Sequence, residues 1–420
     1  MEFKERCVLL QQKDFYLYIL NKYDWAEDYC YYYVYVLYVE RQFIPDILES
    51  ISLEDREKYS EEKAYFYFAK YKKNTLNIAT IIPTCNRPLA IRYLLNCIAL
   101  SYRRYAADII IYDSSDNEDT KKIVDKFRKN GYYNIFYKEY TGIFDGFSLD
   151  HKVIQAYKDF GLKYDYLWLC RDGLVPLIDD IYDKIVYYKQ KNIGCIIVDT
   201  LSRTDGLEIE RYYNTIEDCS DFLKEQADRL QTLGMLILSQ KYSQMLIKEI
   251  PLSDATYSLW QMAAPFHAFI NKPQKVVFTT KNVFAFNLNA SKTHFWSKAD
   301  KCLKQWAERW VSVIEAMPKE YDDVKKDCMM IYTVDFHPFA ADIVWKMRSH
   351  GGLNYSLVVK YKDYLTKVTK TPLWYFYAVS IMPKFVARIL QSIAYRNKET
   401  VKSFLRKINL WYMEDRSKSI

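Results

Sequence analysis

The sequence contains none of the cysteine patterns that build a disulfide framework or a zinc site. Its nine cysteines are an odd number, and no two of them stand as Cys-x-x-Cys or accompany a His-x-x-x-His pair. Scattered, unpaired cysteines are typical of a protein kept in a reducing cytosol. We therefore expect a cytoplasmic protein without structural disulfides or zinc.

Long apolar runs and targeting signals are also missing. The first residues, Met1 to Gln12, lack the basic-then-apolar order of a signal peptide. No stretch reaches the roughly 20 apolar residues that a membrane-spanning helix needs, and no repeat or low-complexity tract occurs. Half of the 420 residues are hydrophobic and 27% are charged, so the composition is that of a globular chain with two or three packed units.

Tyrosine is abundant, with 40 copies in a chain that is 17% aromatic. A tyrosine side chain joins an apolar ring to a polar tip, so it suits half-buried surfaces, sugar-stacking platforms and membrane interfaces. A genome-wide bias in base composition explains the same abundance without any function. The net charge of +7 is modest.

Three segments differ in their residue patterns. Residues 1–76 carry helical periodicity and form a helical N-terminal segment. Residues 77–298 alternate short β-branched runs with helical patterns, and residues 299–420 are helical again, with a basic and aromatic composition. We expect the middle segment to be the catalytic domain.

The middle segment predicts an α/β fold. Strands are predicted at residues 76–82, 108–112, 134–137, 166–170 and 194–198, and helices follow from Pro88 and over 119–127, 153–160 and 179–190. Regular alternation of strand and helix favours a doubly wound, mainly parallel sheet with right-handed crossovers.

Polar residues follow three of these strands. The first strand runs into Pro83-Thr84-Cys85-Asn86-Arg87, the second into Asp113-Ser114-Ser115-Asp116, and the fourth into Cys170-Arg171-Asp172-Gly173. In open α/β sheets ligands bind beyond the carboxyl ends of the strands. We therefore expect the three motifs to converge on one rim of the sheet.

Together the motifs resemble those of the family 2 inverting glycosyltransferases of the GT-A fold, the kind that build bacterial surface polysaccharide or glycoconjugates. In that family the first strand typically ends in I-I-P-T-x-N-R, the second in D-x-S-x-D-x-T and the fourth in a DXD-like acidic motif. The resemblance runs from about Leu76 to Asp199, weakens through about Phe286 and is absent at both ends of the chain.

The resemblance implies transfer of a sugar, with inversion, from a nucleotide diphosphate donor to a carbohydrate or lipid-linked glycan acceptor. UDP is the expected nucleotide. The residues implied in binding the donor are Pro83, Thr84, Asn86, Arg87, Asp113, Ser115, His151 and Arg171.

Among the donor-binding residues, Pro83 and Thr84 would line the nucleoside pocket and Arg87 would lie near the diphosphate. Asp113 would accept a hydrogen bond from an N–H of the base, as a carboxylate does well. Asp116 and Asp119 precede a helix, where carboxylates cap free N–H groups, so we assign them that structural role.

Asp172 is the implied ligand of Mg²⁺ or Mn²⁺, which would neutralise the departing diphosphate, and we count it with the catalytic residues. The family usually offers two carboxylates at this strand, whereas Cys170 and Gly173 stand at the flanking positions here. Arg171 offers an alternative positive charge for the diphosphate. Its other interpretation is an ordinary surface residue.

Two further parts of the site are less defined by the sequence. Gly146, Asp150 and His151 precede the helix that leads into the fourth strand, and His151 is either a polar contact to the donor or a plain helix-start residue. The base that deprotonates the acceptor is predicted to be Asp254, which also fits a turn or a helix cap. Rivals for the base are Asp205, Glu208, Glu249 and His267.

The C-terminal part from residue 355 is basic and aromatic, with apolar residues over 372–393 and a basic amphipathic pattern over 398–411. Such a pattern is typical of a peripheral attachment to the inner face of the cytoplasmic membrane. A helical lid packed on the catalytic domain, with solvated lysines, is the alternative.

Other functional classes fit less well. A nucleotidyltransferase needs a glycine-rich phosphate loop after the first strand, and Ile82 to Asn86 contains no glycine. Acidic groups at three strand ends would repel a nucleic acid. The remaining alternative is a catalytically degenerate GT-A protein that acts as a sugar- or partner-binding scaffold.

Overall fold

The computed structural model describes most of the chain from residue 73 to residue 396. The gaps within this range are residues 143–147, 200–207, 228–229, 231, 250–258, 272–274, 282, 288–298 and 331–338, and residues 69 and 403 are described in addition. The predicted helical segment 1–76 therefore lies almost wholly outside the described residues, as do the basic helix over 398–411 and the candidate base Asp254.

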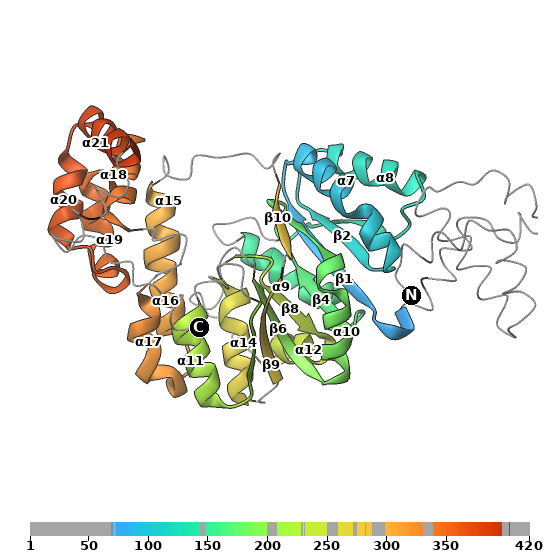
Figure 1. Cartoon of the computed structure of the whole chain (residues 1–420). Coiled ribbons are helices and arrows are strands. Elements are labelled where there is room, and N and C mark those ends of the chain that lie inside the picture. Colours follow the sequence, from blue (N-terminus) through green and yellow to red (C-terminus); the bar gives the residue numbers. More distant parts are fainter. Residues whose placement is uncertain are drawn as a thin grey trace, which may run out of the picture.

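The centre of the molecule is an eight-stranded sheet in the order β3-β2-β1-β4-β8-β6-β9-β7 (Figure 1). The strands are β1 (Ile78–Thr84), β2 (Asp108–Asp113), β3 (Ile135–Glu139), β4 (Tyr166–Leu169), β6 (Ile193–Asp199), β7 (Glu210–Tyr213), β8 (Leu236–Ser239) and β9 (Lys275–Thr280). The pairs β1–β2, β1–β4, β2–β3 and β6–β9 are parallel, and β7 and β8 run antiparallel to their neighbours. The predicted α/β class with a mainly parallel sheet is confirmed.

The central strands are buried on both faces, which explains their nearly continuous apolar sequences. Along β1, Ile78 and Ile82 belong to one hydrophobic cluster, while Ala79 and Ile81 belong to the other. Every residue of β1, β2 and β4 is buried. Alternation with period two thus distributes a single apolar run between two cores.

Helices cover both faces. The cluster with Ile78 and Ile82 includes α7 (Pro88–Arg104), α8 (Asp119–Lys129) and α10 (Tyr182–Gln190). The cluster with Ile81 includes α9 (Ser148–Phe160), α11 (Ile216–Gln226), α12 (Gln240–Glu249) and α14 (Trp260–Asn271). The sheet is therefore doubly wound, as the strand and helix alternation predicts.

The described residues beyond 299 are largely helical, in agreement with the prediction for this region. They form α15 (Ala299–Leu303), the π-helical segment η5 (Lys304–Arg309), α16 (Trp310–Glu315), α17 (Asp322–Met329), α18 (Ala341–Ser349), α19 (Tyr355–Val368), α20 (Leu373–Ile381) and α21 (Lys384–Arg396). Figure 1 shows α18 to α21 gathered at the end of the molecule away from the sheet.

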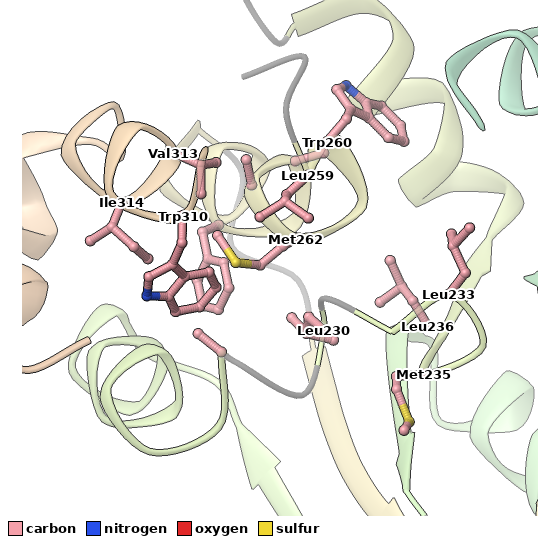
Figure 2. Close-up of a cluster of buried hydrophobic side chains, with 14 of the residues drawn as sticks. Leu230, Leu233, Met235, Leu236, Leu259, Trp260, Met262, Trp310, Val313 and Ile314 are labelled. Atoms are coloured by element: carbon pink, nitrogen blue, oxygen red, sulfur yellow. The ribbon is translucent and has the colours of Figure 1, made fainter. Parts of the chain in front are cut away.

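Helix α16 joins the C-terminal region to the sheet layer. Trp310, Val313 and Ile314 are fully buried and share a cluster with Leu259 and Met262 of the α14 region (Figure 2). The Trp310 indole Nε1 also donates to the Met329 carbonyl at 3.1 Å. A hydrophobic core that runs across both regions makes them depend on each other for stability.

A two-stranded unit, β5 (Leu174–Pro176) paired antiparallel with β10 (Phe284–Phe286), was not expected from the sequence. It follows the Arg171–Asp172 motif directly. Just after β10, the Asn287 amide Nδ2 donates to the carbonyl oxygens of Ala90 and Asp172, both at 2.8 Å. This unit therefore fixes the backbone of the predicted acidic motif.

The first testable consequence concerns the shared core. Replacing Trp310 with Ala should lower the free energy of unfolding by about 3–5 kcal/mol, because a fully buried indole leaves a large cavity. The matched variant Trp374→Ala, whose side chain is 63% exposed, should change it by no more than about 0.5 kcal/mol. Denaturant unfolding of both variants checks this, and equal losses would contradict the packing described here.

Candidate active site at the carboxyl edge of the sheet

A cleft of about 520 Å³ lies where β1, β2 and β4 end. Pro83 and Thr84 come from the end of β1, Ser114 directly follows β2, and Arg171 and Asp172 follow β4. Because parallel strands end at the same edge, the three sequence motifs meet there as expected. Helix α9 and segment η5 supply further lining residues. The volume is typical of a site for a small organic ligand.

Asp172 is the most constrained side chain of the cleft. It is 6% exposed, its Oδ2 accepts from the Thr84 hydroxyl at 2.9 Å, and its Oδ1 accepts from Arg87 Nη1 at 2.9 Å. The carboxylate thus links the ends of β1 and β4 to the start of α7. A buried carboxylate is tolerated here because a cation and a hydroxyl both satisfy it.

The surroundings of Asp172 do not fit a divalent cation as they stand. Both carboxylate oxygens are engaged by the chain's own donors, one of them a guanidinium. Within the described part of the chain, no group of three or more His, Cys, Asp or Glu side chains could hold a metal ion. Metal binding by Asp172 stays a prediction, and it would require Arg87 to leave Oδ1.

Lys152 is a cleft residue that the sequence reasoning did not single out. Its Nζ donates to the Thr84 carbonyl at 2.8 Å and to the Ser114 hydroxyl, and it lies 5.4 Å from the centre of the Tyr140 ring. The side chain is buried, and burial lowers its pKa. The sequence feature that could have identified Lys152 is its position on the otherwise apolar face of α9, four residues before Ala156.

Asp150 also faces the cleft, from the first turn of α9. Its Oδ1 accepts from the Leu259 backbone N–H at 3.0 Å, and the side chain is 7% exposed. Burial raises the pKa of this carboxyl to about 6, although the nearby Arg309 charge opposes the rise. A carboxyl with a pKa near 6 exchanges protons readily close to neutral pH.

Segment η5 brings Gln305 and Arg309 into the same cleft. The wider π-helical turn interrupts the α15–α16 helix at this point, and such turns are frequent at functional sites. Arg309 Nη1 donates to Gln305 Oε1 at 3.4 Å. The C-terminal region therefore lines part of the cleft, which agrees with the packed-lid alternative for this region, although the sequence did not single out Gln305 or Arg309.

Asp113, Ser115 and Asn86 do not line the cleft and form a local network. Asp113 is fully buried, and its Oδ1 accepts from the Ser115 N–H at 3.0 Å and from the Ser115 hydroxyl at 2.6 Å. Its Oδ2 accepts from the Tyr137 hydroxyl at 3.3 Å, and burial together with this carboxylate raises the pKa of Tyr137 to about 12. The backbone N–H of Asn86 donates to the Ser115 hydroxyl at 2.7 Å. The network holds the loops after β1 and β2 together.

The other predicted side chains are placed as follows. His151 is half-buried and does not line the cleft. Among the rival bases, Glu208 pairs with Lys281, Glu249 ends α12, and His267 is half-buried in α14, where burial lowers its pKa. Glu208 and His267 do not line the described cleft. Asp205, Asp254 and Gly146 lie outside the described residues.

Asp116 and Asp119 lie at exposed positions around the start of α8. Neither accepts from a helix N–H as a side-chain cap, since α8 has Glu118 at its N-cap position without a side-chain capping bond. Asp119 nevertheless lies in the first turn, where its charge favours the helix dipole. The capping bond expected for these residues is therefore not formed, whereas their helix-start position is correct.

The sequence matches no protein-family model and no curated protein. Among solved structures, the mannosyltransferase PcManGT from Pyrobaculum calidifontis in complex with GDP-Man and Mn²⁺ is similar at 11% identity and a TM-score of 0.42, over 84% of this chain and 97% of that chain. S. aureus TarS 1–349 is similar at 12% identity and a TM-score of 0.42, over 77% and 92%. Glucosyl-3-phosphoglycerate synthase from Mycobacterium tuberculosis in complex with Mg²⁺ and UDP is similar at 11% identity and 0.39, over 60% and 84%. Likenesses this distant do not establish an activity for this chain.

The raised pKa of Asp150 has a measurable consequence. Its folded pKa lies above that of an unfolded aspartate, so folding stability falls as pH rises from about 4 to about 6. Replacing Asp150 with Asn removes this loss. The stability of Asp150→Asn relative to wild type should therefore improve over that range, by at most about 3 kcal/mol.

The variant Asp218→Asn provides a control of opposite sign. Hydrogen bonds from the Asn214 and Thr215 backbone N–H groups lower the pKa of Asp218. The Asp218→Asn substitution should therefore lower the free energy of unfolding by a larger amount as the pH rises through the acidic range. Denaturant unfolding at several pH values checks both, and a pH-independent difference for Asp150→Asn would rule out the proposed environment.

Proposed function

We propose that this chain is a glycosyltransferase that moves a sugar from a nucleotide diphosphate donor, a UDP-sugar, to a carbohydrate or lipid-linked glycan acceptor with inversion. The observation that carries the proposal is the meeting of three sequence motifs in one cleft. Four of the eight residues predicted to bind the donor line it, namely Pro83, Thr84, Arg87 and Arg171, together with the predicted metal ligand Asp172.

The charge of the cleft suits a diphosphate. Four basic residues line it, namely Arg87, Lys152, Arg171 and Arg309, against two acidic residues, Asp150 and Asp172. Guanidinium and ammonium groups bind phosphate oxygens strongly, and in a partly water-excluded site they stabilise charge that develops on a leaving group. The cleft therefore favours departure of a nucleoside diphosphate.

Positive side chains thus offer the charge that a metal ion supplies in many enzymes of this chemistry. Mg²⁺ or Mn²⁺ would add a Lewis acid at the diphosphate if Arg87 released Asp172. In the arrangement described here, Arg87 is held at the cleft wall by its ion pair with Asp172. Lys152 is held by Thr84 and Ser114. Both cations are oriented before any ligand arrives, which lowers the cost of binding an anion.

The acceptor hydroxyl must lose a proton as it attacks the sugar. Of the two acidic residues in the described cleft, Asp172 is paired with Arg87 and accepts from Thr84, whereas Asp150 accepts only from the Leu259 and Trp260 backbone N–H groups and has a pKa of about 6. Asp150 is therefore a candidate general base beside Asp254. At pH 7 most of it is ionised and able to accept a proton.

Donor binding is the first test. UDP and UDP-sugars should raise the thermal midpoint of the wild-type protein, since a ligand at 100 times its Kd adds about 2.7 kcal/mol of stability. Arg87→Gln should abolish most of this shift. The matched variant Arg104→Gln, at the other end of α7 and paired with Asp179 outside the cleft, should keep it.

Running the same titrations in EDTA and in Mn²⁺ separates the two ways of neutralising the diphosphate. Stabilisation that persists in EDTA supports the cationic side chains, whereas stabilisation seen only with Mn²⁺, and lost in Asp172→Asn, supports a metal at Asp172. Failure of every nucleotide to bind would contradict the proposal.

Turnover is the second test. Asp150→Asn should bind UDP as wild type does but lose about 10²- to 10⁴-fold in the rate of sugar transfer or of donor hydrolysis. An unchanged rate would exclude Asp150 and return the role to Asp254. Wild-type protein that binds the donor without any turnover would favour the degenerate scaffold.

A further inference from the structure

Exposed apolar side chains gather on the C-terminal helices. Among the described residues, fourteen large hydrophobic side chains are exposed, and seven of them lie between residues 355 and 393. They are Tyr355, Val359, Trp374, Ile381, Phe385, Ile389 and Ile393. The other seven are spread over the chain from Leu89 to Tyr212. A concentration of this kind marks an interaction surface rather than ordinary scatter.

Helix α21 presents its part of this surface as a stripe. Phe385, Ile389 and Ile393 are spaced by four residues, so they lie on one side of the helix. The opposite side packs on α18, with Ala387 fully buried and the Ser349 hydroxyl donating to Gln391 Oε1 at 2.6 Å. The stripe is therefore directed away from the core.

The charge around the stripe has one sign. No Asp or Glu occurs from Tyr364 to Lys398, whereas this stretch contains Lys367, Lys370, Lys384, Arg388, Arg396 and Lys398. Arg396 follows Ile393 by three positions and flanks the stripe, whereas Arg388 is exposed but donates through Nε to the Ser349 carbonyl of α18 at 3.2 Å. Lys367 is paired with Glu315, which leaves the basic residues of α21 beside the apolar stripe. Apolar side chains next to positive charges complement an anionic lipid bilayer.

We propose that the surface formed by Trp374, Ile381, Phe385, Lys384, Ile389 and Arg396, called here the α20–α21 face, docks on an anionic membrane surface. The apolar side chains enter the boundary between headgroups and acyl chains, as those of amphipathic interfacial helices do. Trp374, 63% exposed, suits the interface because its indole combines an apolar body with an N–H donor. The lysine and arginine side chains reach back to lipid phosphates.

A second copy of the chain fits this face less well. A two-fold contact through the stripe would bring the Lys384, Arg388 and Arg396 side chains of one copy close to the same cations of the other. Acidic side chains that could compensate are missing from this stretch of the sequence. Charge complementarity therefore selects the lipid surface.

No single described helix is long and apolar enough to cross a membrane. The helices Leu373–Ile381 and Lys384–Ile393 are long and apolar enough for a membrane span only when taken together, and the chain bends by 117° between them.

The test is co-sedimentation of the full chain with vesicles of phosphatidylcholine alone and of phosphatidylcholine with phosphatidylglycerol. Wild-type protein should bind the anionic vesicles, bind the neutral ones far less, and be released by salt. Phe385→Glu with Ile389→Glu should abolish binding. The control Phe136→Glu with Leu162→Glu makes the same chemical change at exposed sites elsewhere and should bind as wild type does.

A charge series tests the electrostatic part. Each basic residue near an anionic surface changes the partition coefficient about fivefold, so Lys384→Gln with Arg396→Gln should weaken binding about 25-fold. Lys121→Gln with Lys122→Gln, on the exposed side of α8, should leave it unchanged. Circular dichroism and thermal midpoints establish that each variant is folded.

Three outcomes would overturn the proposal. They are failure of wild type to bind anionic vesicles, equal binding by the α21 double-glutamate variant, and a concentration-dependent dimer in solution that this variant abolishes without any vesicle binding. Because the readout is sedimentation, the result does not depend on whether the cleft transfers a sugar.

Discussion

Burial of the central sheet on both faces is the constraint from which the rest of the structure follows. Strands β1, β2 and β4 have no solvent-exposed face, so their side chains must be apolar or internally satisfied along their length. Polar chemistry is then possible only where a strand ends and its backbone leaves the core. Thr84, Ser114 and Asp172 stand at those points, which is why one short rim of the sheet collects the reactive groups.

The rim is held by one ion pair and by hydrogen bonds from or to charged side chains. Arg87 and Thr84 satisfy Asp172, Lys152 satisfies the Thr84 carbonyl, and Asp150 takes the Leu259 N–H. Together these bonds join the ends of β1 and β4, the start of α7, the first turns of α9 and the residue before α14. The same bonds keep two cations at the cleft wall without a ligand, so binding of an anion needs little reorganisation. Gly173 stands beside Asp172, where the resembled family usually has a second carboxylate. In the proposed function, the cations at the cleft wall offer positive charge that does not depend on a second carboxylate.

Different C-terminal helices have the features of the two alternatives that the sequence presented, a packed lid and a membrane-facing surface. Segment η5 contributes Gln305 and Arg309 to the cleft, and α16 packs Trp310 into the core that supports it. This part behaves as the packed lid. Helices α20 and α21, at the end of the molecule away from the sheet (Figure 1), instead expose apolar and basic side chains. The residues that line the cleft and the surface that we propose to dock on a membrane therefore belong to different helices of one region.

The sequence by itself determined the fold class, the strand ends and the part of the cleft that the ends of β1 and β4 form, including Pro83, Thr84, Arg171 and Asp172. Runs such as Ile78 to Ile82 can be buried only in a doubly covered sheet, and parallel strands bring their carboxyl ends together, so Thr84 and Asp172 had to meet. The tertiary structure alone decided which charges pair. Arg87 pairs with Asp172, Lys152 bonds to the Thr84 carbonyl, and the Arg309 charge lies near Asp150. These partners are 68 to 159 positions apart in the sequence. Arg309 also lies in a π-helical turn, which has no simple sequence signal. Local periodicity carries no information about such distant contacts, because they depend on how whole helices pack against the sheet.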